Sequence, residues 1–233
     1  MRQVVLDTET TGLEPARGHR VIEIGCVELL NRRATGRHYH SYLNPEREVD
    51  EGARAVHGLS LADLADKPRF ADVADEFLQF INGAELIIHN AGFDIGFLDA
   101  EFERLSRDPP IRIDSLCTVL DTLALAREMH PGQRNNLDAL CKRYGIDNSH
   151  RELHGALLDA RILADVYLAM TGGQSALALD EAPRRAGARS GGVIAANLSL
   201  AVVTANAEER AAHEQLQELL QKESKGRCLW RNP

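Results

Sequence analysis

Four acidic residues and one histidine have the side-chain types that can hold divalent cations over a phosphodiester. They are Asp7 and Glu9 in DTETTG, Asp94 in HNAGFD, and His154 and Asp159 in HGALLDA. Sites built from carboxylate oxygens suit Mg2+ or Mn2+, and two such ions can activate water and stabilise the attacking and leaving oxygens. The residue types therefore predict two-metal hydrolysis of a phosphodiester, if the fold brings the three segments together.

The first acidic segment follows an apolar run, residues 4–6, that is typical of a buried strand and is bounded by the turn signal TTG. Side chains alternate along a strand, so Asp7 and Glu9 share one face. Adjacent carboxylates at the end of a buried strand repel one another and lose hydration, and a cation would relieve both effects. Taken alone, the pair also fits a solvated strand end.

Asp94 follows a second strand-like run, residues 86–88, and lies where apolar residues begin to recur at helical spacing over residues 92–105. The pattern places it near the N-terminus of a helix that leaves a strand. Either a metal ligand or a helix-start carboxylate favoured by the helix dipole fits this position.

Asp159 lies in the first turn and a half of a predicted helix over residues 155–170. If His154 belonged to the same helix, it would point roughly 140° away from Asp159. The sequence therefore places His154 on the loop before the helix, where it could act as a general base because imidazole has a pKa near 6.5. A lone histidine at such a place is otherwise a surface or capping residue.

Taken in this order, the three segments resemble the exonuclease motifs of the DEDDh superfamily, which has a ribonuclease H-like α/β fold. The resemblance extends over the whole chain to the proofreading epsilon subunits of bacterial DNA polymerase III. It is also carried by AVHGL, MTGGQ, AAHE and the terminal CLW. It implies a mixed central sheet flanked by helices and a 3′-5′ exonuclease that removes mispaired 3′-terminal nucleotides as 5′-monophosphates.

In such a two-metal site Asp7 would bridge the cations, Glu9 and Asp159 would complete the shell of the first, and Asp94 would hold the second directly or through water. Asp7, Glu9 and Asp159 would thereby also contact the substrate phosphate.

The resemblance further implies that the terminal nucleotide contacts His57 and the segment that begins at Gly52, and that Phe93 packs beside its base. Gly52 stands where a larger polar residue is expected in related chains. Any contact at this position must therefore come from the backbone.

The patterning predicts an α/β domain over residues 1–170, a flexible linker over 171–192 and a partner-binding tail over 193–233. The resemblance implies that the first segment is the exonuclease domain and that the tail binds the polymerase. Within the first segment strand-like and helical runs alternate, as in an α/β domain. The predicted strands cover 21–30, 37–43 and 85–88, and the predicted helices cover 70–81, 116–128 and 137–144. The linker is rich in Gly, Ala, Ser, Pro and Arg.

The linker and the tail carry the predicted partner sites. Residues 174–179 resemble a short peptide that docks a sliding clamp, with Gln174, Leu177 and Leu179 as anchors. The tail, with a helical pattern over 207–223, is too short for a stable core of its own. It should fold against a partner, which the resemblance implies is the polymerase alpha subunit; the alternative is packing on its own catalytic domain. The family also implies a small stabilising theta-like subunit.

Charge and composition fit a tethered enzyme. Of the 27 basic and 35 acidic residues, 19 and 28 lie in residues 1–170, which gives this segment a net charge of −9. Such a charge predicts weak binding of free DNA, so a partner should deliver the 3′ terminus. The sequence shows no long apolar run, no signal peptide and no CxxC spacing. These features predict a cytoplasmic protein with no membrane span, and neither a zinc site nor a disulfide framework.

Two other functions are compatible with parts of the sequence. A DEDDh exonuclease acting on RNA or short oligonucleotides would share the five catalytic residues, but it would not need the linker and the apolar tail. A non-catalytic subunit that bridges polymerase and clamp would not need every acid and the histidine. The chain has both the five catalytic residues and the linker with its apolar tail. This combination favours the proofreading exonuclease.

Overall fold

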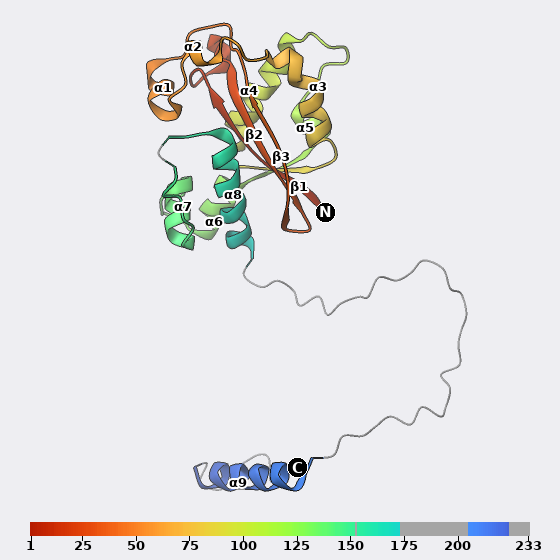
Figure 1. The fold of residues 1–233 in the computed structure, drawn as a ribbon, viewed down its shortest axis with the longest axis vertical. Helices are drawn as coiled ribbons and strands as arrows, with labels where there is room; N and C mark the ends of the chain where they lie inside the picture. The colour runs from red at the N-terminus through yellow and green to blue at the C-terminus, as the bar shows by residue number, and fades with distance from the viewer. Residues whose placement is uncertain (152, 173–204, 224–233) are drawn as a thin grey trace, which may run out of the picture. The chain divides into compact units, whose positions relative to one another are not determined.

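The computed structural model describes residues 1–151, 153–172 and 205–223. The chain divides into two compact units, Met1–Leu179 and Asp180–Pro233. The described part of the first unit is an α/β fold, and that of the second contains one helix, α9 (Ala207–Glu223) (Figure 1).

The first unit is built on a five-stranded mixed sheet with the order β3-β2-β1-β4-β5. Its strands are β1 (Arg2–Thr10), β2 (Val21–Leu30), β3 (Arg33–Tyr42), β4 (Glu85–Ile88) and β5 (Thr118–Asp121). The first three form antiparallel pairs, whereas β4 runs parallel to both β1 and β5. The predicted mixed sheet with flanking helices is confirmed.

Helices connect the strands and cover the sheet (Figure 1). They are η1 (Pro15–Arg17), α1 (Glu51–His57), α2 (Leu61–Leu64), α3 (Phe70–Ile81), α4 (Ala91–Arg104), α5 (Ile113–Leu116), α6 (Thr122–Met129), α7 (Leu137–Tyr144) and α8 (Ala156–Thr171). Predicted strands 21–30 and 85–88 and predicted helices 70–81 and 137–144 have the observed bounds.

Alternation along β1 sends its side chains to two different cores. Val4 and Leu6 pack with the phenylalanines of α3 and α4. Val5 packs with Ala160 and Leu163 of α8. Burying both faces explains why this strand reads as a continuous apolar run rather than as an alternating one.

One predicted helix, residues 116–128, is wrong in its first part, residues 117–121, whereas residues 122–128 are helical as predicted. The structure ends α5 at Leu116, pairs β5 with β4 through Leu86↔Val119 and Ile87↔Leu120, and begins α6 only at Thr122. The side chain of Asp121 accepts hydrogen bonds from the backbone N–H groups of Leu123 and Ala124, which caps the new helix. Pairing with a neighbouring strand overrides the helical spacing of these few apolar residues.

The predicted linker and tail fall largely outside the described residues. The peptide with Gln174, Leu177 and Leu179 lies wholly outside them. The helical pattern predicted for the tail coincides with α9, whose Leu216, Leu219 and Leu220 are exposed. The predicted boundaries at 170 and 192 remain predictions. Among the helices of the described segments, none has the length and apolarity needed to cross a membrane.

Candidate active site

The acidic side chains of β1 lie beside the first turn of α8. Asp7 pairs in register with Gly25 of β2. A Cβ atom on Gly25 would lie 2.2 Å from backbone atoms of Ala156 and Leu157, which are the first two residues of α8. Gly25 therefore lets the helix approach the sheet backbone, and Asp159, one turn further on, comes next to the acidic end of β1.

Asp94 enters the same acidic group from α4. It is 3% exposed and accepts a 2.7 Å hydrogen bond from the hydroxyl of Thr8, which lies between the two acids of β1. Asn90 precedes the helix in the left-handed conformation, with φ 67°, and turns the chain from β4 into α4. The predicted position of Asp94 near a helix N-terminus is confirmed.

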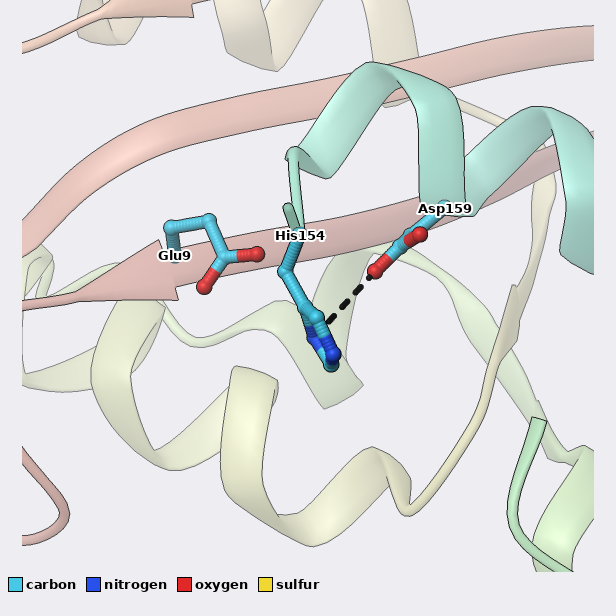
Figure 2. Close-up of side chains that lie close together, drawn as sticks. All are labelled: Glu9, His154 and Asp159. Atoms are coloured by element: carbon cyan, nitrogen blue, oxygen red, sulfur yellow. Dashed lines mark ion pairs between the residues drawn. The ribbon is translucent and has the colours of Figure 1, made fainter. Parts of the chain in front are cut away.

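Glu9 of β1 converges with His154 and Asp159, which come from the loop before α8 and from the first turns of α8 (Figure 2). One ligand atom of each lies within 4.8 Å of one ligand atom of the others, and His154 Nδ1 lies 3.6 Å from Asp159 Oδ2. His154 is on the loop before α8, as predicted, and its backbone N–H donates to the carbonyl of Val56 at the end of α1. This bond ties the histidine loop to α1.

Mutual repulsion and burial leave the site poorly suited to four ionised carboxylates. Burial, and then the charges of Asp94, Glu9 and Asp159, hold the pKa of Asp7 well above its ordinary value. Burial and the charge of Asp159 raise the pKa of Glu9 to about 8. Burial raises the pKa of Asp94 to about 7, against the opposing effect of the Thr8 hydrogen bond. Bound cations would remove this repulsion.

His154 has a lowered pKa, caused first by desolvation and then by the charge of Arg151, with Asp159 acting in the opposite direction. The imidazole is therefore held in its neutral form near pH 7. A neutral ring is the form that a general base requires.

Arg151 is the residue of this site that the sequence interpretation missed. Its guanidinium bonds both carboxylate oxygens of Asp159, at 2.5 and 2.6 Å, and lies 3.0 Å from His154 Nδ1. The available signal was a basic residue three positions before the histidine and eight before the acid. An exposed loop arginine has the same local pattern. Spacing alone therefore did not distinguish an arginine of the site from an ordinary surface arginine.

The residues predicted to contact the nucleotide line one pocket of about 440 Å3. Gly52, His57 and Phe93 all border it, together with Glu9 and exposed Leu13. Among the described residues, no atom lies within 4 Å of the place that a Cβ on Gly52 would take. The structure thus gathers the predicted nucleotide residues beside the acidic group, and their contacts with DNA remain a prediction.

Divalent cations fit this donor set. Asp7, Glu9, Asp94 and Asp159 offer hard oxygen ligands, and their shared repulsion disappears when positive charge is bound. The donors come from β1, α4 and α8, so one cation site would connect three separate elements of the fold. The choice between Mg2+ and Mn2+ does not follow from the ligand atoms, because both accept carboxylate oxygen.

Comparison with known proteins places the chain in a family. Residues 4–167 match the model of the exonuclease family RNase_T. The chain is 57% identical to the DNA polymerase III subunit epsilon of Salmonella typhimurium, over 99% of this chain and 97% of that protein. It is 56% identical to the subunit of the same name from Escherichia coli K12, with the same coverage.

Solved structures share the fold. Exonuclease X in complex with 5′ overhanging duplex DNA aligns with a TM-score of 0.57 and 26% identity, covering 73% of this chain and 91% of that one. Exonuclease I, at 19% identity and a TM-score of 0.62, covers 73% of this chain and 42% of its own. The chain therefore belongs to the exonuclease family and, within it, to the DNA polymerase III epsilon subunits.

Proposed function

We propose that this chain is the proofreading 3′-5′ exonuclease subunit of the replicative DNA polymerase III. It removes mispaired 3′-terminal nucleotides by metal-dependent hydrolysis of the last phosphodiester. The observation that carries the proposal is the convergence of Glu9, His154 and Asp159 beside Asp7 and Asp94, in a chain that matches epsilon subunits over nearly its full length.

The four carboxylates are the proposed cation ligands. Asp7, at the centre of the acidic group, would bridge two cations, with Glu9 and Asp159 on one side and Asp94 on the other. The cations, Mg2+ or Mn2+, supply the charge that activates water and stabilises the reacting oxygens. The protein contributes the orientation of the ligands, since Thr8 fixes Asp94 and Arg151 fixes Asp159.

His154 is the proposed general base. Because an arginine only donates, the 3.0 Å contact from Arg151 Nη2 makes His154 Nδ1 an acceptor and leaves the proton of the neutral ring on Nε2. Nδ1 can take a proton from water once the ring turns out of this contact. The ring has room to turn because its side chain is 43% exposed, and catalytic hydrogen bonds commonly form only with substrate bound.

The pocket beside Glu9 is the proposed seat of the terminal nucleotide. Phe93, Val56 and Leu13 give it apolar walls against which a base can pack. His57 Nδ1 accepts a 3.1 Å hydrogen bond from the N–H of Leu59, which places the ring proton on Nε2. The Nε2–H group of His57 makes no hydrogen bond of normal geometry to the described residues. Because this nitrogen is buried, it would donate to a sugar or phosphate oxygen only after a local movement that opens the pocket wall.

Partners are expected to bring the DNA 3′ terminus to the catalytic domain, because the acidic charge of that domain predicts weak binding of free DNA. We propose that the tail over 193–233 binds the polymerase alpha subunit. The exposed leucines of α9 support a helix that docks on another protein. The linker peptide with Gln174, Leu177 and Leu179 would bind the sliding clamp, and a theta-like subunit would bind the catalytic domain. Such a replication complex acts on DNA in the cytoplasm.

The first test is digestion of a 5′-labelled primer with a mismatched 3′ end, in Mg2+ or in EDTA. The full chain should shorten the primer from its 3′ end only with Mg2+, and Asp7→Ala should abolish shortening. Asp165→Ala removes an exposed acid of α8 and serves as the matched control, with activity retained. Folded wild-type protein that leaves both DNA and RNA primers intact would refute the nuclease, and RNA digestion alone would favour an RNA-trimming exonuclease.

A further inference from the structure

Arg151 joins two helices through the active-site histidine loop. Its Nη1 donates to Asp138 of α7 at 2.8 Å, while Nε and Nη2 donate to the two oxygens of Asp159 in α8 at 2.5 and 2.6 Å. Only 8% of the arginine side chain is exposed. Asp138 also accepts a hydrogen bond from Asn148. The guanidinium is therefore held on one side by α7 and on the other by the proposed metal ligand.

A guanidinium is a planar fork, so paired bonds to both oxygens of a carboxylate fix the plane of that carboxylate as well as its position. Without this fork, Asp159 could rotate about its terminal bond. The same nitrogen that holds one oxygen of Asp159 also contacts His154 Nδ1. One side chain thus sets the orientation of two residues that face Glu9.

The bonds from Arg151 leave capacity for a cation. Each carboxylate oxygen has two lone pairs, of which the arginine takes one. The ligand atoms of Glu9, His154 and Asp159 lie within 4.8 Å of one another while these bonds are in place. Asp159 can therefore keep its bonds to Arg151 and still face Glu9 and His154 as a candidate cation ligand.

We propose that Arg151 is a positioning residue of the cation site, which orients Asp159 for metal binding and is itself braced by Asp138. This inference rests on the proposed function only in that it takes Asp159 as a cation ligand. The opposite arrangement is competition, in which the positive guanidinium displaces cations from Asp159. The two make opposite predictions for metal affinity, because losing a positioning residue weakens binding and losing a competitor strengthens it.

The test is direct measurement of Mn2+ binding to the full chain by titration calorimetry, without DNA. Arg151→Gln should raise the Mn2+ dissociation constant about 10- to 100-fold, as expected when a partner that orients a metal ligand is lost. Arg151→Lys keeps the charge but not the fork, and its dissociation constant should stay closer to that of Arg151→Gln than to that of the wild type. Arg161→Gln, which removes an exposed arginine of α8, the helix that carries Asp159, should bind Mn2+ like the wild type.

A purely structural role would lower the fraction of protein that binds and leave the dissociation constant of the folded fraction unchanged. Circular dichroism and the fitted stoichiometry separate these two effects. An unchanged or smaller dissociation constant in Arg151→Gln would overturn the proposal, and so would full recovery in Arg151→Lys. Mn2+ binding is measured without DNA, so this test is separate from the test of nuclease activity. A wild-type chain that binds Mn2+ but digests no primer would refute the nuclease. The role of Arg151 would then still be decided by the Mn2+ dissociation constants of its variants.

Discussion

Replacing Glu9 with glutamine should make the metal-free protein more stable near neutral pH, although it removes a proposed metal ligand. Glu9 is 8% exposed, and burial, Asp159 and Glu23 raise its pKa to about 8. In the folded protein this carboxyl therefore holds its proton more tightly than in the unfolded chain. Its contribution to stability is fully present below the ordinary pKa of 4.5 and is lost as the pH rises towards 8.

The size of the effect follows from these two pKa values. For a single carboxyl that titrates at 4.5 when unfolded and near 8 when folded, the unfolded chain ionises while the folded carboxyl still holds most of its protons. This difference lowers stability by about 4 kcal/mol near pH 7.5 and by less than about 1 kcal/mol near pH 5. Asp7 and Asp94 titrate in the same acidic group, so replacing Glu9 also changes their protonation, and the contributions do not add simply. We expect Glu9→Gln to raise the free energy of unfolding by about 2–4 kcal/mol near pH 7.5.

The assay is urea unfolding of the full chain in EDTA, followed by circular dichroism at both pH values. Glu103→Gln, at an exposed position of α4, is the control and should change stability little at either pH. In excess Mg2+ the order should reverse, because wild-type protein gains binding energy that Glu9→Gln has lost. A Glu9→Gln protein that is no more stable than wild type in EDTA near pH 7.5 would refute the electrostatic reasoning.

Three further results are expected. His154→Gln should slow primer digestion about 100- to 10,000-fold while calorimetry still detects Mn2+ binding; a near-normal rate would exclude it as the base. Gly25→Ala should lower stability by about 2 kcal/mol or more in a thermal melt, since its Cβ would meet the backbone of α8 at 2.2 Å; an unchanged melting temperature would contradict that contact. A chain ending at residue 172 should still digest primer but should not co-elute with the polymerase subunit, and co-elution would place polymerase binding outside the tail.

The sequence by itself was sufficient for the family, the mixed sheet and the local setting of each acidic segment. Asp7 and Glu9 lie on one strand, Asp94 near a helix start and His154 on a loop because alternation, helical spacing and turn signals act over a few residues. Such patterns depend on neighbours in the chain, which the sequence displays directly. The roles of the individual site residues remain predictions.

Only the tertiary structure revealed β5 and the place of Arg151. Residues 118–121 become a strand because β4 offers a parallel partner, and four residues carry too weak a local preference to decide between strand and helix. Arg151 resembles any loop arginine until Asp138 and Asp159 enclose it. The approach of α8 to β2 at Gly25 likewise joins segments more than 100 residues apart in the sequence. Contacts of this kind depend on how whole elements pack, and local residue patterns do not encode them.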